Sequence, residues 1–387
     1  MTVTARPPRA RASAPHAVLL ALLRGDDVAA AAAAVRDTGE WTAIAGAAGR
    51  HALAPLLHRA LGEAAPVPVA AREAIRARAV AVTARSLLLV DELQAVLAAL
   101  AGRGLRAVPL RGPALAERLH GDPTVRESGD LDLLVRRDDV DAVAAALAGR
   151  GFQAVDRRPG FARRFSYTLE LARRRHGWVI VEPHWSLAYP PFAGALDMDA
   201  VWRRVQPGAV AGVPIAQLAA GDLLLHLALH LEHKGGAAAP LLWTWELDRL
   251  VRLEGATLDW DAAVAGARAA GGGAVVARAL GRAVDLLATP VPPGVLAALH
   301  PPAAPRDRRL ARLADSGVDG AESLALLFAL PTLGARLQYA AALLFPSGPF
   351  MRLEYGARGR AGLAAAYCRR LATFSREGIR GLARLLG

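Results

Sequence analysis

Two aspartates separated by one residue, Asp130 and Asp132, open a short apolar run at residues 133–135. Leucines and a valine that follow a glycine predict a short buried strand. Side chains alternate between the two faces of a strand, so both carboxylates project the same way and repel each other. A cation such as Mg²⁺ compensates such a pair, because it binds carboxylate oxygens together with substrate phosphates. The alternative is a solvated pair at the start of a strand, since short motifs discriminate loosely.

A turn lies upstream, between a predicted strand at residues 105–110 and a predicted helix at residues 113–119. The turn contains Arg111 and Gly112, and Pro113 follows at the first helical position. Glycine allows a tight turn, and proline suits the first turn of a helix. The free N–H groups of a helix N-terminus suit a phosphate. Arg111 and Gly112 are therefore candidate nucleotide-binding residues.

The order of glycine turn, helix and D-x-D strand resembles the nucleotidyltransferases of the DNA polymerase β type. The chain is more closely similar to an uncharacterised bacterial nucleotidyltransferase family, whose signature matches at residues 110–112, 114–116, 119–122, 126 and 130–135. Two positions depart from the pattern: Arg111 replaces the family's lysine, and Pro113 replaces a serine that is common in the wider superfamily. Arginine can still hold a phosphate as a planar fork, whereas proline removes a backbone donor and a hydroxyl from the turn.

The resemblance implies a third catalytic carboxylate, which falls on Glu182 at the end of a predicted strand. Without the upstream motif, Glu182 would be interpreted as a surface residue. With it, Asp130, Asp132 and Glu182 are the expected ligands of Mg²⁺ or Mn²⁺, and a nucleoside triphosphate is the expected co-substrate. Glu182 is also expected to assist deprotonation of the acceptor. His184 either orients a substrate phosphate, contacts a carboxylate or is structural.

Four further residues have two interpretations each. Arg126 either neutralises a phosphate or pairs with one of the aspartates. His226, His230 and His233 fall on one face of a predicted helix at a zinc-compatible spacing. The glutamate that follows the first histidine in metalloprotease motifs is absent. We therefore expect these histidines to be structural or to line the cleft. The resemblance makes His226 and His230 candidate substrate-side residues, and His184 is a third candidate.

The pattern of elements predicts an α+β fold that is mostly α overall. We expect a small mixed β-sheet nucleotidyltransferase core flanked by N-terminal and C-terminal helical layers. One strand is expected at residues 165–172, and the chain is expected to return to helices from residue 215. Asp248, on a predicted amphipathic helix, is expected to be a solvated charge. The expected organisation is a disordered tail at 1–15, a helical region at 16–104, the core at 105–210 and a helical region at 211–387.

Composition narrows the class of protein. The 387 residues are 53% hydrophobic, which indicates a folded chain, and the net charge of +12 comes almost wholly from arginine. This charge allows affinity for polyphosphates, but no basic patch is interleaved with base-stacking aromatics, so we do not expect a nucleic-acid partner. Cys368 is the only cysteine, so no intrachain disulfide can form and the cytoplasm is the expected compartment.

The last stretch of the chain, residues 361–386, is basic and helical in pattern. It could lie on an anionic membrane surface as a peripheral contact, dock a partner or cover the core, and we favour the last. Apolar runs at residues 324–330 and 340–345 are too short for a transmembrane segment of roughly 20 residues.

Together these residues predict a metal-dependent nucleotidyltransferase. It would transfer a nucleoside monophosphate from a triphosphate such as ATP to an unidentified acceptor, with release of pyrophosphate. The acceptor would be a small molecule, a peptide or a protein, and the resemblance suggests a natural-product tailoring role. The alternative is a catalytically inactive scaffold or binding protein that kept the fold.

Overall fold

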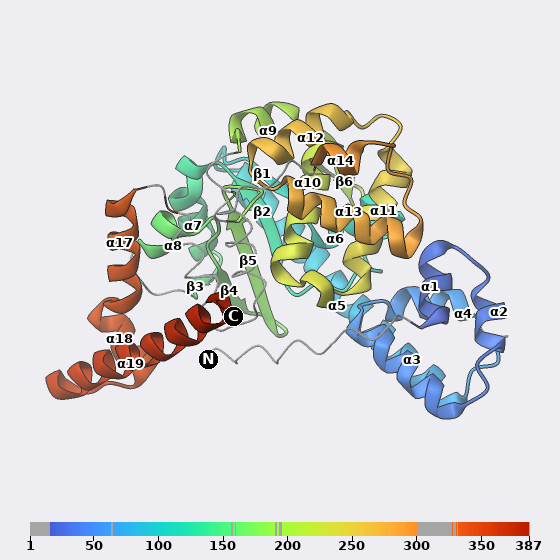
Figure 1. Cartoon of the computed structure of the whole chain (residues 1–387), viewed down its shortest axis with the longest axis horizontal. Coiled ribbons are helices and arrows are strands. Elements are labelled where there is room, and N and C mark those ends of the chain that lie inside the picture. The colour runs from blue at the N-terminus through green and yellow to red at the C-terminus, as the bar shows by residue number, and fades with distance from the viewer. Residues whose placement is uncertain are drawn as a thin grey trace.

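A computed structural model of the chain describes residues 16–62, 65–155, 158, 160–189, 192, 196–299, 327, 330 and 332–386. The predicted disordered tail and most of the apolar run at 324–330 lie outside these residues. Helices dominate, and a small sheet lies among them (Figure 1). The predicted mostly α, α+β fold is therefore confirmed.

The central sheet has five strands: β1 (Ala107–Pro109), β2 (Leu131–Val135), β3 (Gln153–Ala154), β4 (Leu171–Arg174) and β5 (Trp178–His184). Their spatial order is β1-β2-β5-β4-β3, and only β2 and β5 run parallel. The sheet is mixed, as predicted. In the parallel pair, Asp132 lies opposite Glu182 and Leu134 lies opposite His184. The two predicted carboxylate positions are therefore neighbours across adjacent strands.

Two predictions about strands were wrong in part. The strand expected at 165–172 is shorter, because residues Phe161–Phe165 form helix α8 and β4 begins only at Leu171. Residues 166–170 lie beside β5 without forming a regular strand, because Pro183 of β5 has no N–H to donate to a ladder of hydrogen bonds. Its carbonyl oxygen instead accepts from the backbone of Leu169, at 3.0 Å.

The second correction is an unpredicted hairpin of β6 (Gln206–Val210) and β7 (Val213–Gln217). Its two-residue turn is Ala211-Gly212, and both residues have positive φ, 48° and 75°. Such turns usually carry Asn-Gly or Asp-Gly, so alanine at this position hid the signal. The chain returns to helices at α10, after residue 219.

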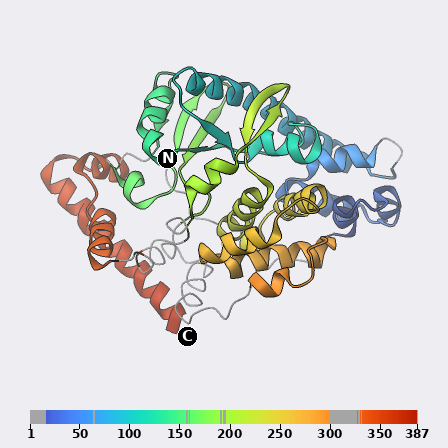
Figure 2. The ribbon, with the colours of Figure 1, turned by 90° about the horizontal axis from the view of Figure 1, so that it is seen from above.

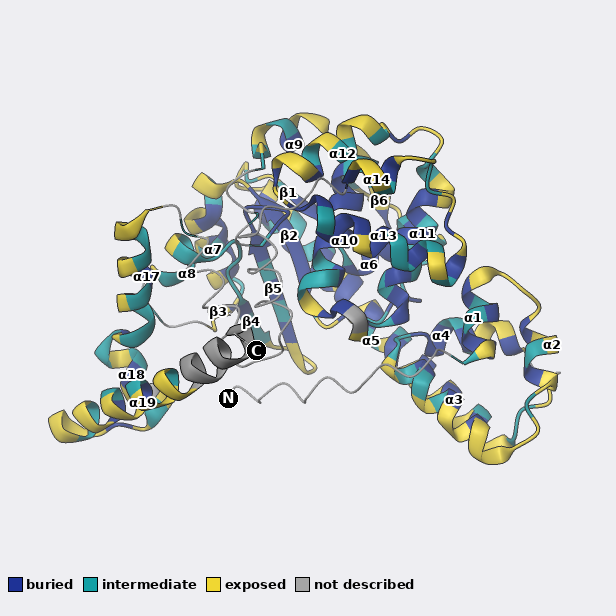
Figure 3. Cartoon of the chain, in the orientation of Figure 1, coloured by how far each residue is buried: buried dark blue, intermediate teal, exposed yellow. Residues whose placement is uncertain are grey.

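Alternation along β2 sorts its side chains between two cores. Leu131, Leu133 and Val135 pack on the face covered by α5 (Val69–Ala101) and α7 (Val140–Ala148). Leu134 packs on the opposite face, against α10 (Ala220–Lys234) and the helices that follow it. Asp132 shares the face of Leu134 and therefore points toward α10. The strand is buried along its whole length, which places a carboxylate in the interior (Figure 3).

The first four helices of the chain lie on one side of this core, and the last three described helices lie on the other side (Figure 1). Four short helices, α1 to α4, pack against α5, and their apolar cluster includes Leu241 and Leu242 of α11 and Leu287 of α13. They are α1 (Ala17–Arg24), α2 (Val28–Ala33), α3 (Thr38–Arg50) and α4 (Ala54–Leu61). The remaining elements of the core are α6 (Gly112–His120), η1 (Arg137–Asp139), α9 (Met198–Arg204), η3 (Gly236–Ala238), α11 (Leu241–Glu254), α12 (Trp260–Ala269), α13 (Gly273–Leu287) and α14 (Val295–Leu299).

The last helices, α17 (Leu333–Leu344), α18 (Gly348–Tyr355) and α19 (Gly359–Leu386), stand apart from the sheet (Figure 2). They bury a small cluster of their own, which contains Met351, Ala357 and Ala366. Tyr339 of α17 contacts Phe161 and Phe165 of α8. Among the described residues, these helices therefore touch the edge of the core rather than covering it, contrary to the favoured interpretation.

No helix in the described part of the chain has both the length and the hydrophobicity needed to cross a bilayer.

Candidate active site

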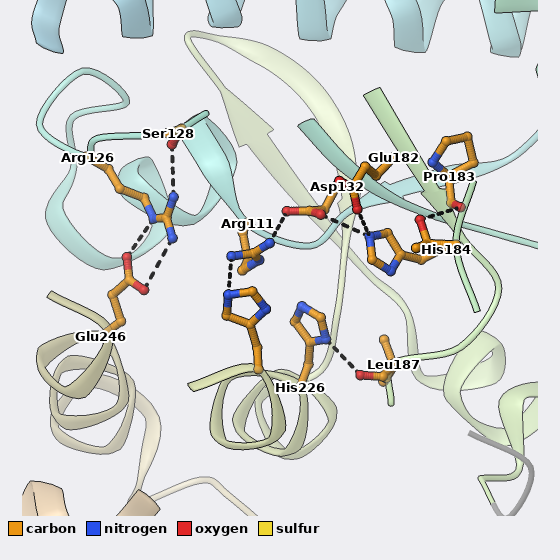
Figure 4. Close-up of polar contacts among 12 residues, drawn as sticks. Arg111, Arg126, Ser128, Asp132, Glu182, Pro183, His184, Leu187, His226 and Glu246 are labelled. Carbon is orange, nitrogen blue, oxygen red and sulfur yellow. Dashed lines mark hydrogen bonds and ion pairs between the residues drawn. The ribbon is translucent and has the colours of Figure 1, made fainter. Parts of the chain in front are cut away.

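Three side chains from β2 and β5 meet at the face of the sheet that points to α10. Ligand atoms of Asp132, Glu182 and His184 lie within 4.8 Å of one another, close enough to share one metal ion. His184 Nε2 is 2.9 Å from Asp132 Oδ1 and 3.6 Å from Glu182 Oε2 (Figure 4). Asp132 and His184 are buried, whereas the Glu182 side chain keeps 24% of its surface exposed. The group differs from the predicted ligand set in one member, since His184 stands in the place of Asp130.

Arg111 lies between this group and α10. Its Nη2 is 2.6 Å from Asp132 Oδ2, and its Nη1 donates to His230 Nε2 at 2.6 Å. Gly112 follows with φ of +68°, a conformation in which other residues are strained. It begins α6, and Pro113 occupies the first turn, as the sequence predicted. The turn thus places an arginine and a helix N-terminus beside the carboxylates.

The two aspartates of the site differ in how far neighbouring positive charge compensates them. Burial and the neighbouring Asp132 carboxylate raise the pKa of Asp130 to about 6. Burial alone would raise the pKa of Asp132 too, but Arg111 and the hydrogen bond with His184 hold it well below its usual range. For His184, burial would lower the pKa, but Asp132 and Glu182 outweigh burial and raise it. Asp130 is therefore the carboxyl that lacks sufficient positive charge, and a divalent cation fits that deficit.

Two histidines of α10, His226 and His230, are neutral. Burial and Arg111 lower the pKa of His226 to about 4 and hold that of His230 well below its ordinary value. Neutral His226 donates from Nδ1 to the carbonyl oxygen of Leu187 at 2.9 Å, which leaves Nε2 buried without a partner. His233 stacks on Tyr189 instead of joining its two neighbours. Within the described residues, none of the three belongs to the group that could share a metal ion, and of the three only His230 lines the pocket described below.

Arg126 pairs with neither of the two aspartates but with a glutamate of α11. Its Nε is 2.6 Å from Glu246 Oε1 on α11, and its Nη1 donates to Ser128 Oγ at 2.9 Å. Both side chains of the ion pair, which Figure 4 draws, are buried. Asp248 is also buried, contrary to the expected solvated charge, because Arg252 and Thr289 contact its carboxylate. Charged residues of α11 therefore anchor the loop before β2 and the end of α13.

The end of α6, from which this loop leaves, is also held against α11. The ring of His120 stacks there on Trp245, with centroids 4.5 Å apart. Burial, with a smaller effect from Arg249, lowers the pKa of His120 to about 4. An unfolded chain protonates this residue near pH 6.5, so the folded state loses stability as the pH falls from 6.5 toward 4. At pH 5 the loss attributable to His120 is about 2 kcal/mol.

His120→Phe keeps the ring stack and removes the titration. We expect its free energy of unfolding to fall about 2 kcal/mol less than that of the wild type between pH 7.5 and pH 5. Urea unfolding at the two pH values measures the difference. The contribution of His226 is present in both proteins and cancels. Equal losses in the two proteins would contradict the assignment of acid sensitivity to His120.

A pocket of about 330 Å³ opens over these residues. The predicted residues Arg111, Asp130, Asp132, Glu182 and His184 line it, as do Arg126 and His230. His226 does not line it. Sequence reasoning missed further lining residues, namely Glu127, Ser128, Gly129, Tyr167, Lys234 and Trp243. Of these, Lys234 is distinctive in the sequence, because it is the single lysine of the chain.

A family model described as an uncharacterised nucleotidyltransferase matches residues 37–288, well over half of the chain. The chain belongs to this nucleotidyltransferase family. It is therefore a nucleotidyltransferase enzyme with a nucleotide substrate, and the match spans every residue that lines the pocket. No curated protein and no solved structure matches the chain.

For this nucleotidyltransferase, the family and the group of Asp132, Glu182 and His184 together suggest a divalent metal. The donor atoms fit one: the carboxylate oxygens of Asp132 and Glu182 suit Mg²⁺ and Mn²⁺, and His184 is hydrogen-bonded to Asp132. When bound, such an ion polarises phosphoryl oxygens and stabilises charge on the attacking and leaving oxygens.

Proposed function

We propose that the nucleotidyltransferase transfers a nucleoside monophosphate from a Mg²⁺- or Mn²⁺-bound triphosphate to a hydroxyl or phosphate acceptor. The observation that supports this proposal most directly is the pairing of Asp132 with Glu182 across parallel strands, beside the Arg111-Gly112 turn. Asp130, Asp132 and Glu182 would hold the metal. His184 would fix the Asp132 carboxylate through its hydrogen bond.

Phosphate binding and proton transfer would fall to different residues of the pocket. Arg111 and the N-terminus of α6 would bind phosphate oxygens of the triphosphate. Glu182, which is open to the pocket, would accept the proton of the acceptor hydroxyl. The acceptor oxygen would form a bond to the α-phosphorus as the bond to the bridging oxygen breaks and pyrophosphate leaves.

We propose a small molecule, a peptide or a protein as the acceptor, and a natural-product tailoring role for the enzyme. The charged and aromatic lining of the pocket supports a polar acceptor with a stacking or apolar group, because Tyr167 and Trp243 line it with Glu127. We also propose residues 105–210 as the catalytic core. Helices α10 and α11, from the proposed C-terminal helical region at 211–387, would close the pocket.

Two observations favour the alternative of an inactive scaffold. Arg111 Nη2 lies 2.6 Å from Asp132 Oδ2, where it would compete with a metal, and Pro113 removes a backbone donor from the turn. A scaffold with this arrangement would keep Asp132 neutralised by the protein itself. An active enzyme requires Arg111 to exchange Asp132 for a phosphate.

Calorimetric titration with ATP, GTP, CTP and UTP, with and without Mg²⁺, distinguishes the active enzyme from the inactive scaffold. We expect the wild type to bind at least one triphosphate only when Mg²⁺ is present. Glu182→Gln should lose the metal-dependent part of that binding, because it removes an anionic ligand without changing the side-chain volume. Asp199→Asn, which neutralises an exposed carboxylate elsewhere, serves as the control. No binding of any triphosphate by the wild type would favour the scaffold.

A further inference from the structure

Lysine is used once in this chain. Of its 47 basic residues, all but Lys234 are arginine. A composition so biased toward arginine places arginine wherever an arginine serves equally well. The position of the single lysine therefore identifies a site where the two cations differ in what they do.

Lys234 is the last residue of α10 and lines the pocket. It follows His230 by one helical turn, so both side chains project from the same side of the helix. Its charge lowers the pKa of His230 and acts in the same direction on Glu170, the residue before β4. Lys234 and Glu182 both line this pocket.

The other two cations of the pocket already have carboxylate partners. Arg111 pairs with Asp132, and Arg126 pairs with Glu246. Lys234 is exposed and forms no hydrogen bond or ion pair with the residues that the structure describes. A triphosphate carries about four negative charges, only some of which a divalent metal neutralises. Among the described pocket residues, Lys234 is the cation that can bind phosphate without first giving up a carboxylate.

Arginine would serve poorly at this position. Its planar fork forms bidentate pairs with carboxylates, and both Glu182 and Glu170 lie on this part of the sheet. Such an ion pair would prevent Glu182 from accepting the proton of the acceptor hydroxyl. A lysine ammonium is a compact point charge on a flexible stem and can follow phosphate oxygens instead.

We propose that Lys234 binds the terminal phosphates of the nucleotide and thereby selects triphosphates over shorter nucleotides. This inference rests on the proposed function and adds to it the residue that recognises the leaving pyrophosphate. Lys234 is a specificity-determining residue here, in contact with the part of the substrate that is lost in the reaction.

The test is calorimetric binding of the tri-, di- and monophosphate of one nucleoside, in the presence of Mg²⁺. The probes are ATP, ADP and AMP, or the same series of whichever nucleoside the wild type binds. We compare wild type, Lys234→Ala and Lys234→Arg. The control is Arg278→Ala, which removes a positive charge that contacts Glu232 of α10 outside the pocket.

Lys234→Ala should weaken triphosphate binding about 10- to 100-fold, the usual effect of losing a charge-assisted hydrogen bond. Monophosphate binding should change less than about twofold, because the monophosphate does not reach Lys234. Lys234→Arg should restore triphosphate binding only in part, and Arg278→Ala should behave as wild type.

Two results would overturn the proposal and leave the proposed function standing. One is an unchanged preference for triphosphate in Lys234→Ala. The other is an equal loss of affinity for all three nucleotides, which would indicate a general effect on the pocket. A wild type that binds no nucleotide would instead overturn the proposed function, and with it the assignment of Lys234.

Discussion

Asp132→Asn is expected to weaken Mn²⁺ binding by more than about 100-fold, a larger loss than the 10- to 100-fold typical of residues that only support a metal ligand. The reason is the position of Asp132, which alone among the carboxylates is adjacent both to Glu182 across the strands and to His184 through a hydrogen bond. Asparagine keeps the volume and one acceptor oxygen but removes the anionic ligand. Mn²⁺ binding followed by electron paramagnetic resonance measures the metal directly and needs no acceptor.

The same substitution also affects stability, because Arg111 loses its closest counter-charge. Arg111 still lies near Asp130, Glu182 and Glu246, so we expect a cost of about 1–3 kcal/mol rather than unfolding. Asp132→Ala would cost more, since it also removes the acceptor for His184. Asp199→Asn, at an exposed carboxylate, should leave both Mn²⁺ binding and stability unchanged. If Asp132→Asn bound Mn²⁺ as well as the wild type, the metal site would have to lie elsewhere.

The sequence predicted the parts of the site that depend on short-range patterns. The D-x-D strand, the Arg111-Gly112 turn and the helix after it are each visible within about ten residues. Glu182 lies 50 residues from Asp132, and its strand shows no special spacing. The family resemblance pointed to this residue, and the register of β2 and β5 explains why it lies beside Asp132. Parallel pairing cannot be read from strand patterns alone, because the crossover between the strands hides it.

The remainder of the site depended on contacts between distant segments. The expected carboxylate partners of Arg126 were Asp130 and Asp132, four and six residues later, yet it pairs with Glu246, 120 residues later. Glu246 gave one signal, since it is a charge in the apolar helix that also contains Asp248. Both acids are buried because each has an arginine to neutralise it. Helical periodicity assigned such charges to solvent, and tertiary pairing reversed that assignment.

Glu246→Ala is expected to lower the free energy of unfolding by about 3–5 kcal/mol. Removal of one partner of a buried ion pair leaves the other charge in the interior without compensation. Here both side chains are at most 4% exposed, and the guanidinium of Arg126 would retain only Ser128 as a side-chain partner. Urea denaturation at neutral pH measures the loss. Because Arg126 belongs to the loop that leads to Asp130, Mn²⁺ affinity should fall as well.

A matched control exists on the same helix. Glu254 of α11 forms a bidentate pair with Arg118 of α6, with both distances 2.8 Å, but its side chain is 27% exposed. Glu254→Ala should therefore cost less, about 1–2 kcal/mol, because Glu254 is partly exposed and Arg118 keeps the carbonyl oxygen of Leu218 as an acceptor. The double variant Arg126→Met with Glu246→Leu should recover most of the stability lost in Glu246→Ala, because apolar side chains of similar volume need no compensation. A cost for Glu246→Ala no greater than that for Glu254→Ala would show that the buried pair does not hold the loop.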